Sequence, residues 1–498
     1  MRDRAAVVLT TVVAALHLAV ANRYDLFRDE LYFIVCGRHP AFGYVDQPPL
    51  VPLLDAATYA LGAQTWVERL PAVVAAAALV WVVVKFARLL GGVNGAAWCA
   101  GAAAGFAPML MGLTATVNTT TFEPLAWTLV AYGLARVAIA DDRRAPLWAG
   151  LVAGLAMEAK YALPLWLAGL AAGLIVFPER RILRYRELWI GVAIATLIAL
   201  PSVLWQAAHG FPFRELVRNA HLKDIAAGPL PFALNQIVVI TPLFAALALL
   251  GLIAPFAMKR LRAVRFIPVA FALAAIAIVA GGGKDYYLAA AYPPLFALGS
   301  VAFEAIVRNA IVRGVLVGIS VAGALVAAPL ALPILSPPTL VAYQAALHIH
   351  PAAQERGDAG DALPPTFADM LGWHDFVREV GAAYDSLPPA ERARTAIVVD
   401  NYGEAAALDV YGYEYHLPEA LCGHNQYFFW AERGQHPVDV LRVQDNPERL
   451  APFCATVKVF GTTTGRYARD FENGKTIALC RGLHPDIATI WPSLKVFI

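Results

Sequence analysis

Long apolar runs recur along the first two thirds of this 498-residue chain. Many of them reach the length of about 20 residues that an α-helix needs to cross a bilayer. Charged residues make up 15% of the sequence, whereas an average soluble chain carries about 25%. The sequence therefore predicts an α-helical polytopic membrane protein and excludes an ordinary soluble one. We expect about eleven membrane-spanning helices, at residues 5–21, 66–85, 95–113, 122–140, 147–157, 162–177, 188–207, 232–257, 266–281, 286–303 and 311–332.

Basic residues are concentrated in alternate loops between these runs, near residues 2–4, 85–88, 143–144, 180–186, 259–265 and 308–313. The positive-inside rule assigns such loops to the cytoplasm. The N-terminus is then cytoplasmic, and the loop at residues 22–65 faces outward. The same residues are dispersed rather than gathered in one patch, so no nucleic-acid partner is predicted. We expect a multi-pass protein of the bacterial cytoplasmic (inner) membrane, surrounded by membrane lipids.

The chain changes character after Leu332, where prolines precede a polar region that continues to the C-terminus. We divide it into a transmembrane domain at residues 1–332 and an extracytoplasmic (periplasmic) α/β domain at residues 333–498. The turn Asn401-Tyr402-Gly403 has two interpretations, an anion site at a helix N-terminus or a simple helix cap. We expect strands at residues 395–400, 426–430, 438–443, 455–460 and 476–480, and a helix at residues 404–411.

Three cysteines lie in this tail, at Cys422, Cys454 and Cys480. An oxidising exterior permits a disulfide bond, although three cysteines leave one unpaired. Cys454 and Cys480 lie beside or within neighbouring strand-like runs, whereas Cys422 lies in a turn-like stretch. We predict a bond between Cys454 and Cys480, with Cys422 as the alternative partner of either one. No cysteine spacing resembles a zinc site.

The first outward loop is long, charged and stiffened by prolines, unlike a plain connector between two spans. It contains the adjacent acidic residues Asp29 and Glu30 and ends near Pro48-Pro49. A carboxylate just outside a bilayer can act as a base toward a lipid-borne substrate. The alternative is a solvated loop whose charges mark only the membrane boundary. Asp25 and Asp46, in the same loop, read more readily as loop charges.

Further polar groups lie at the same predicted membrane level, in the loops that face outward. They include Glu123, Lys160 and Lys284, and the loop at residues 210–231 adds Arg218. A carboxylate base near cations suits group transfer away from a phosphate leaving group. The simpler interpretations are that the two lysines extend from helix ends toward the interface and that Glu123 caps a helix. We predict that Asp29, Glu30, Glu123, Lys160 and Lys284 line one cavity at the outer membrane face.

Several motifs follow one another along the chain: FRDELYF, VDQPPLVPLL, NTTTFEPLAW, AMEAKYALPL and GGKDYYLAAAYPPLFAL, and in the tail DNYGEAAALDVYG and HNQYFFW. In this order, they resemble the membrane glycosyltransferases of the GT-C class. The resemblance is to the family that contains the protein O-mannosyltransferases and the lipid A aminoarabinose transferase. The tail is similar to the outer domain of bacterial family 39 glycosyltransferases.

This resemblance implies inverting transfer of a hexosyl or pentosyl group from a polyprenyl-phosphate-linked donor. The acceptor would be a hydroxyl of a lipid, glycan or protein on the outer face of the membrane. By the family pattern Asp29 deprotonates the acceptor and Glu30 supports it, while Glu123 is the second acidic residue. The donor phosphate is assigned to Lys160, Lys284, Tyr287 and Arg218.

Two points of the resemblance stay open. Glu123 would either orient the acceptor or, together with Asp29, bind a divalent metal such as Mg, Mn or Zn; no cofactor is otherwise implied. Gln47 stands before the paired prolines, where the aminoarabinose transferases tend to have lysine. The donor and acceptor of those enzymes are therefore not transferred to this chain.

Two functions of other classes compete with this interpretation. A transporter or flippase for a lipid-linked sugar would carry an internal repeat and broken helices with polar residues near the middle of the bilayer. A sensor or assembly protein would use the outer domain as a binding module. Neither accounts for carboxylates and lysines at the outer ends of several spans.

Overall fold

A computed structural model describes the chain except residues 1–2, 226–227, 351–352, 354, 356–359 and 432–436. Its contacts divide into two compact units, and each of them draws on separated parts of the sequence. The helical unit contains Met1–Arg23, Gln64–Leu204 and Ala226–Ile334. The sheet unit contains Tyr24–Ala63, Trp205–Ile225 and Leu335–Ile498. The first outward loop therefore groups with the C-terminal tail, and the division is not one of two consecutive segments.

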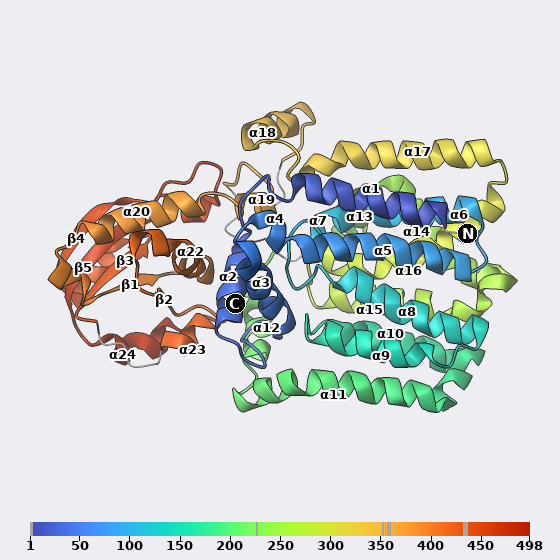
Figure 1. Cartoon of the computed structure of the whole chain (residues 1–498), viewed down its shortest axis with the longest axis horizontal. Helices are drawn as coiled ribbons and strands as arrows, with labels where there is room; N and C mark the ends of the chain where they lie inside the picture. The colour runs from blue at the N-terminus through green and yellow to red at the C-terminus, as the bar shows by residue number, and fades with distance from the viewer. Residues whose placement is uncertain (1–2, 226–227, 351–352, 354, 356–359, 432–436) are drawn as a thin grey trace. The chain divides into compact units, whose positions relative to one another are not determined.

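The helical unit is a bundle whose helices run beside one another (Figure 1). Short 3-10 segments η1 (Pro178–Arg184), η2 (Lys259–Val264), η3 (Asp285–Ala291) and η4 (Ala328–Leu330) join several of its helices. The helices are α1 (Arg4–Val20), α4 (Thr65–Glu68), α5 (Leu70–Leu89), α6 (Asn94–Phe106), α7 (Pro108–Leu113), α8 (Glu123–Ala140), α9 (Ala145–Met157), α10 (Leu163–Val176), α11 (Arg186–Ala208), α13 (Pro229–Ile240), α14 (Pro242–Ala257), α15 (Phe266–Ala280), α16 (Tyr292–Ile306) and α17 (Ala310–Ala327).

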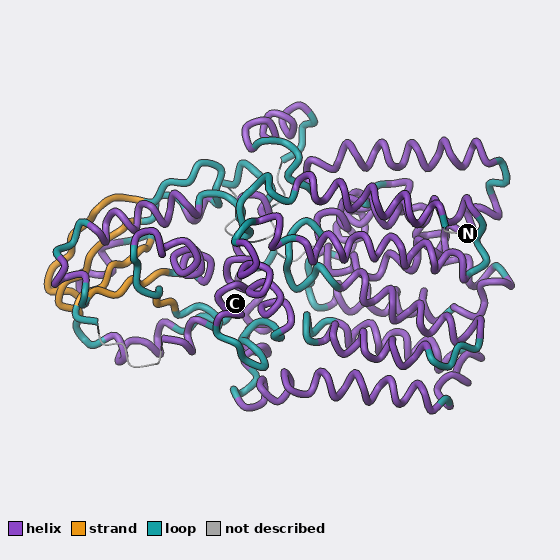
Figure 2. The backbone as a smooth tube through the Cα atoms, in the orientation of Figure 1, coloured by secondary structure: helices purple, strands orange, loops and turns teal. Residues whose placement is uncertain are grey.

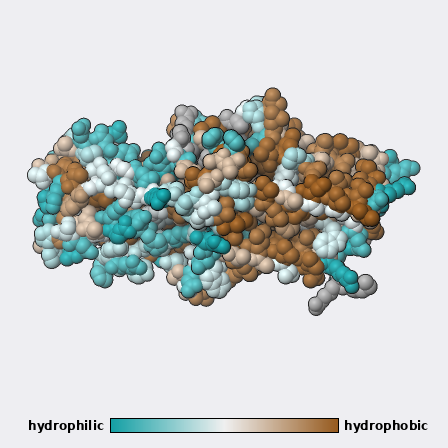
Figure 3. All heavy atoms as spheres, turned by 90° about the horizontal axis from the view of Figure 1, so that it is seen from above, coloured by the Kyte–Doolittle hydropathy of each residue, from teal (hydrophilic) through white to brown (hydrophobic). Residues whose placement is uncertain are grey.

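The surface of this bundle is apolar, as expected of a membrane-embedded protein (Figure 3). On α17, for example, Ile311, Val315 and Ile319 are exposed. Among the described residues, four helices are long and apolar enough to cross a bilayer, or six when two bent pairs each count as one span. The shorter apolar helices α1, α9 and α15 fall below that length. The predicted count of about eleven is therefore not established, although apolar helices occupy the predicted ranges.

Small residues allow close packing inside the bundle. Such packing matters because apolar side chains surrounded by lipid supply little hydrophobic driving force for helix association. Helices α14 and α16 approach closely at Gly251 and Gly299. A Cβ atom at Gly299 would lie 1.9 Å from the carbonyl oxygen of Leu247, and one at Gly251 would lie 2.2 Å from that of Leu295. These two glycines therefore fix the spacing between the helices.

The predicted span at residues 232–257 is broken into α13 and α14, which meet at a bend of 112°. Thr241, between them, has φ of +71°, outside the helical region, and the next residue is Pro242, which has no N–H to continue the helix. The prediction of one continuous helix was therefore wrong. The apolar composition had indicated the segment, but Pro242 determines where α13 ends.

Among its described residues, the sheet unit has five strands in the order β2-β1-β3-β5-β4. They are drawn in orange in Figure 2. β1 lies between β2 and β3 and runs parallel to both, while β5 runs antiparallel to β3 and β4. The register pairs Ile397 with Leu441, and Leu441 with Leu479. The strands are β1 (Thr395–Val399), β2 (Leu421–Cys422), β3 (Asp439–Gln444), β4 (Cys454–Thr462) and β5 (Thr476–Leu483).

Helices of the sheet unit come from the first loop, the 205–225 segment and the tail. The amphipathic helix α20 packs against α22, and α22 packs against α2. The tail also has 3-10 segments η5 (Gly412–Tyr415), η6 (Pro447–Phe453), η7 (Asp470–Glu472) and η8 (Trp491–Leu494). The helices are α2 (Arg28–Arg38), α3 (Leu50–Gly62), α12 (Pro212–Lys223), α18 (Pro337–Ala346), α19 (Pro365–Ala368), α20 (Trp373–Asp385), α21 (Pro389–Arg392), α22 (Tyr402–Tyr411), α23 (Tyr427–Ala431) and α24 (Ile487–Ile490).

One predicted strand of the tail is a helix. Residues 426–430 were expected to be extended because of their aromatic side chains, but they form most of α23. Its first turn begins with backbone bonds from the Phe428 N–H to the Asn425 carbonyl and from the Phe429 N–H to the Gln426 carbonyl. Phe428 packs into a core with Trp491 and Phe497, so burial outweighs the strand preference of aromatic residues. The short strand β2 was not predicted.

The predicted disulfide bond between Cys454 and Cys480 is confirmed. The two residues lie on neighbouring antiparallel strands, β4 and β5, with their Cα atoms 5.3 Å apart. Cys422 is buried and free at the end of β2. A covalent link across this edge of the sheet is expected to stabilise the sheet unit by about 2–4 kcal/mol.

Close packing of α14 against α16 predicts that Gly299→Ala destabilises the protein by about 1–3 kcal/mol, since the methyl group would enter the space of a backbone carbonyl. Gly318→Ala on α17 is the matched control, because no atom lies within 4 Å of a Cβ built there. Thermal unfolding in detergent, followed by intrinsic fluorescence, should show a lower midpoint for the first variant only. Equal midpoints would mean that the two helices do not need this close approach.

Candidate functional site

The acidic pair at the start of α2 is divided between two environments. The Glu30 side chain turns back and accepts a hydrogen bond from the backbone N–H of Phe27 at 2.8 Å, as a capping carboxylate does at a helix N-terminus. Glu30 is fully buried, whereas the side chain of Asp29 keeps 29% of its surface exposed. Asp29 is therefore the member of the pair that a substrate can approach, and Glu30 stabilises the helix that carries it.

Asp29 has two polar neighbours in the sheet unit. Its Oδ1 accepts a hydrogen bond from the hydroxyl of Tyr402 at 2.8 Å, and the Nε of Arg28 lies 3.8 Å from the same oxygen. Arg28 in turn donates its backbone N–H to the carbonyl of Asp369 and places its guanidinium 3.4 Å from that carboxylate. Burial raises the pKa of Asp369 to about 6. The first turn of α2 is thus bound to two segments of the tail.

Asp46, in the same loop, is half-buried and holds the loop through its hydrogen bonds. Its Oδ1 accepts a hydrogen bond from the hydroxyl of Tyr32 at 3.0 Å, and the same hydroxyl accepts one from the backbone N–H of Gln426. Burial raises the pKa of Asp46 to about 7. The side chain of Gln47 is also buried, with its amide nitrogen 3.7 Å from the sulfur of Cys36. Asp46 was expected to be a loop charge; in the structure its carboxylate instead binds the hydroxyl of Tyr32 and links two parts of the sheet unit.

In the helical unit, three of the predicted residues lie together. The ammonium of Lys160 lies 2.9 Å from Oε2 of Glu123, the first residue of α8, and 4.9 Å from the centre of the Tyr287 ring. Lys160 comes from the break between α9 and α10. A small pocket adjoins the pair and is lined by Phe122, Glu123, Trp127, Ala156, Ala159, Lys160 and Leu163. This arrangement combines a buried carboxylate, a cation and aromatic walls.

The remaining predicted site residues are less closely placed. Lys284 immediately precedes η3, is half-buried, and accepts a bond at its carbonyl from the Tyr287 N–H. Arg218 is exposed on α12. Asp29, Glu30 and Arg218 belong to the sheet unit, whereas Glu123, Lys160, Lys284 and Tyr287 belong to the helical unit. The proposal that one cavity is lined by Asp29, Glu30, Glu123, Lys160 and Lys284 therefore stays a prediction.

A cluster around Asp25 was not predicted as a unit. Asp25 lies 3.0 Å from Nε2 of His374 and accepts a hydrogen bond from the hydroxyl of Tyr411, whose ring stacks on His374. The hydrogen bond that His374 donates to Asp25 raises the pKa of His374 above its usual 6.5. The sequence carried a partial signal, because Asp25 and Tyr411 both lie in or beside the motifs quoted above. His374 lies outside those motifs.

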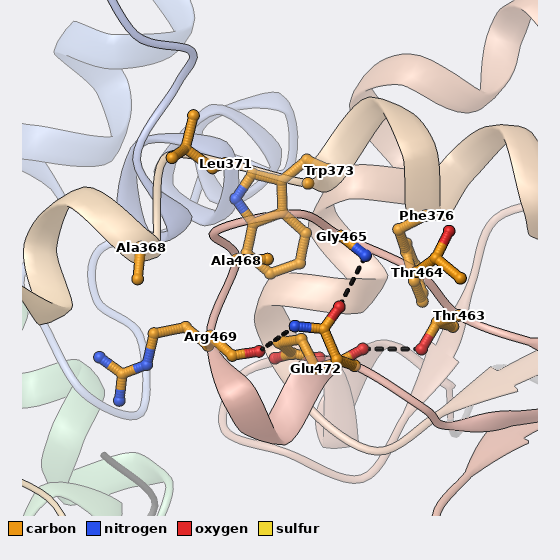
Figure 4. A pocket seen from close by; sticks show the side chains of 12 residues that line it. Ala368, Leu371, Trp373, Phe376, Thr463, Thr464, Gly465, Ala468, Arg469 and Glu472 are labelled. Carbon is orange, nitrogen blue, oxygen red and sulfur yellow. Dashed lines mark hydrogen bonds between the residues drawn. The ribbon is translucent and has the colours of Figure 1, made fainter. Parts of the chain in front are cut away.

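A small hollow lies in the sheet unit beside α20 (Figure 4). Trp373 and Phe376 form its apolar wall. Its polar groups bond to one another, as the dashed lines show: Asn473 accepts from the Gly465 N–H and donates to the Arg469 carbonyl.

A metal site is not apparent from the donor residues. In the described part of the chain, no group of three or more histidine, cysteine, aspartate or glutamate side chains is arranged to hold a metal ion. Asp29 and Glu123 lie in different units. We therefore derive no step through a metal ion.

Comparisons with known proteins show which part of the chain resembles a known family. Residues 46–205 match the model of the dolichyl-phosphate-mannose-protein mannosyltransferase family. The lipid A galacturonosyltransferase RgtD of Rhizobium johnstonii is 31% identical over 208 residues, which cover 41% of this chain and 42% of that protein. This chain therefore matches less than half the length of that curated relative.

The fold is similar to that of ArnT from Cupriavidus metallidurans. The structure of ArnT bound to undecaprenyl phosphate matches with a TM-score of 0.57 at 14% identity, covering 95% of this chain and 97% of that one. The apo structure of ArnT matches with a TM-score of 0.56 over the same shares. The chain thus has a fold similar to that of these structures, and the resemblance found in its motifs is confirmed.

The raised pKa of His374 predicts a pH-dependent contribution to stability. A histidine whose pKa is raised by folding stabilises the folded state below its unfolded pKa, near 6.5, and loses that contribution as the pH rises through the folded value. His374→Gln should therefore lower the thermal unfolding midpoint more at pH 6 than at pH 9. The exposed His416→Gln is the control. An equal loss at both pH values would show that the pairing with Asp25 does not stabilise the fold.

Proposed function

We propose that the protein is a glycosyltransferase that moves a sugar from a polyprenyl-phosphate-linked donor to an acceptor hydroxyl. The reaction is placed on the outer face of the cytoplasmic membrane, with the sheet unit on that side. The accessible carboxylate of Asp29, held at the start of α2 in a chain with the GT-C fold, carries the proposal. A water-accessible base of this kind would have no role in a membrane protein without catalytic activity.

The proposed mechanism assigns one role to each group. Asp29 removes the proton of the acceptor hydroxyl as its oxygen attacks the anomeric carbon of the sugar. The bond between that carbon and the phosphate oxygen breaks, and polyprenyl phosphate leaves with the bonding electrons. Attack opposite the leaving group inverts the anomeric configuration. No covalent intermediate with the protein is formed.

Lys160 is assigned to the departing phosphate. An ammonium carries three N–H donors, and Glu123 takes one of them. The ion pair therefore holds the lysine in place while leaving donors for a phosphate oxygen, where negative charge increases during the reaction. Tyr287 lies beside the ammonium, and its ring restricts where the lysine can point. Lys284 and Arg218 are proposed as further cations for the donor.

The substrate class is inferred from the relatives. RgtD is named as a lipid A galacturonosyltransferase, and ArnT was crystallised with undecaprenyl phosphate. We propose undecaprenyl-phosphate sugars as donors and a cell-envelope lipid, glycan or protein as acceptor. The protein in lipid nanodiscs can be incubated with a panel of such donors and with lipid A or peptide acceptors. Mass spectrometry should find a glycosylated acceptor together with free undecaprenyl phosphate in equal amounts.

Transport of a lipid-linked sugar is the second candidate, because α13 and α14 form a broken helix of the kind found in transporters. Neither of these helices carries an ionisable residue, so the break supplies no charged substrate site. In liposomes, a transporter would move the intact donor across the bilayer without releasing undecaprenyl phosphate. That result would replace the transferase proposal.

The role of Asp29 predicts that Asp29→Asn lowers transfer by about 10²–10⁴-fold, the usual contribution of a general base. The amide keeps the size of the side chain and an oxygen for the Tyr402 hydroxyl, so folding should be retained. Asp375→Asn, at an exposed carboxylate of α20, is the control for a lost negative charge. Full activity of Asp29→Asn would place the base elsewhere, with Glu30 and Glu123 as the next candidates.

The role of Lys160 predicts that Lys160→Gln lowers kcat/KM for the donor by about ten- to a hundredfold, as loss of a hydrogen bond to a charged group does. Lys160→Arg keeps the charge and should retain part of the activity. Lys458→Gln, at an exposed position of β4, makes the same charge change away from the site. Normal donor kinetics in a folded Lys160→Gln variant would exclude contact with the phosphate.

A further inference from the structure

We propose that Tyr402 is a positioning residue for the base, and that the sheet unit orients Asp29 for catalysis through it. The inference rests on the proposed role of Asp29. It concerns the motif Asn401-Tyr402-Gly403-Glu404, which neither the mechanism nor the comparisons explain. All the residues involved lie within the sheet unit.

The key contact is the hydrogen bond from the Tyr402 hydroxyl to Oδ1 of Asp29, at 2.8 Å. A carboxylate on an isolated helix turn rotates about its side-chain torsions, and each orientation presents its oxygens differently. With Oδ1 held by the tyrosine, the carboxylate has one orientation, and Oδ2 is the oxygen that we assign to the acceptor proton. Fixing the geometry of a reacting group can lower an activation barrier substantially.

Tyr402 is itself held on several sides. Its ring is 8% exposed and packs against Tyr32 and His424, with centroids 4.6 Å and 4.9 Å away. The guanidinium of Arg28 lies over the same ring, 5.4 Å from its centre. The hydroxyl therefore has little freedom to leave Asp29. Because Arg28 and Tyr32 both belong to α2, the helix that carries Asp29 also holds the tyrosine.

The neighbours of Tyr402 in the motif fix the start of α22. The side chain of Asn401 accepts hydrogen bonds from the N–H groups of Gly403 and Glu404, at 2.9 Å and 3.1 Å, and it donates to Glu472 at 2.9 Å. Glu404 accepts from the Asp400 N–H at 2.8 Å and forms an ion pair with the buried Lys475. The helix N-terminus is thus filled by its own side chains. This favours the cap over the anion site in the interpretation of the turn.

Gly403 completes the arrangement, because α22 contacts Arg28 at this point. A Cβ atom at Gly403 would lie 2.6 Å from Cγ of Arg28. Only a residue without a side chain allows the arginine stem to pass, and so allows its guanidinium to reach the Tyr402 ring and Asp369. Each of the four motif residues therefore has a function in placing the tyrosine hydroxyl on Asp29.

A purely structural role for Tyr402 is the alternative, and the chain offers a matched control. Tyr427 is also a buried tyrosine of the sheet unit, and its hydroxyl donates to a half-buried carboxylate, that of Asp409, at 2.7 Å. Tyr427→Phe and Tyr402→Phe each remove one such hydroxyl and leave the ring in place. If the hydroxyls serve only stability, the two variants should behave alike.

The test measures donor kinetics of both variants in nanodiscs, using the undecaprenyl-phosphate sugar that the wild-type protein consumes. We expect Tyr402→Phe to lower kcat by about ten- to a hundredfold, the loss expected for one hydrogen bond to a charged group, with KM for the donor unchanged. Tyr427→Phe should keep kcat near the wild-type value. Gly403→Ala should show the same fall in kcat as Tyr402→Phe, because it displaces Arg28.

A double variant that combines Tyr402→Phe with Asp29→Asn tests this inference separately from the proposed function on which it rests. If Tyr402 acts through Asp29, Tyr402→Phe should change the residual activity of the Asp29→Asn variant little. A kcat for Tyr402→Phe equal to that of Tyr427→Phe, while Asp29→Asn is inactive, would overturn the inference and leave the proposed function intact. Full activity of Asp29→Asn would overturn both.

Discussion

Three consecutive ionisable residues at the start of α2, Arg28, Asp29 and Glu30, have to be accommodated in a largely buried environment. Buried charges are costly unless they are paired and hydrogen-bonded. Glu30 is satisfied locally by the backbone of its own helix end. Arg28 and Asp29 lie 3.8 Å apart, and their further partners, Asp369 and Tyr402, come from the tail. This requirement explains why the first outward loop and the tail fold as one compact unit.

The two adjacent acids at the start of α2 lie in different environments and therefore suit different chemical roles. Asp29 keeps part of its surface exposed and has a hydroxyl donor on one oxygen, whereas Glu30 is enclosed. In the helical unit, Glu123 is likewise paired, with Lys160, beside a cavity with aromatic walls. A base and a phosphate-binding cation are the two groups that sugar transfer from a lipid phosphate requires.

Much of this organisation was predictable from the sequence, and the failures have physical causes. Apolar runs predicted the helical bundle, since length and hydropathy are local properties. Strand-like runs around Cys454 and Cys480 predicted their bond correctly. The break at Thr241 and the helix at α23 were missed, because a proline and the burial of Phe428 outweighed average preferences. The contact of Tyr402 with Asp29 joins residues 373 positions apart, and no local pattern reveals it.

An experimental structure with a non-hydrolysable phosphonate analogue of the consumed donor would test the central claim most directly. The account predicts the phosphonate within hydrogen-bonding distance of the Lys160 ammonium. It also predicts that the anomeric carbon faces a carboxylate oxygen of Asp29 across one cavity open to the outer leaflet. A donor bound away from Lys160, or Asp29 and Glu123 on opposite sides of the bundle without a common cavity, would contradict it.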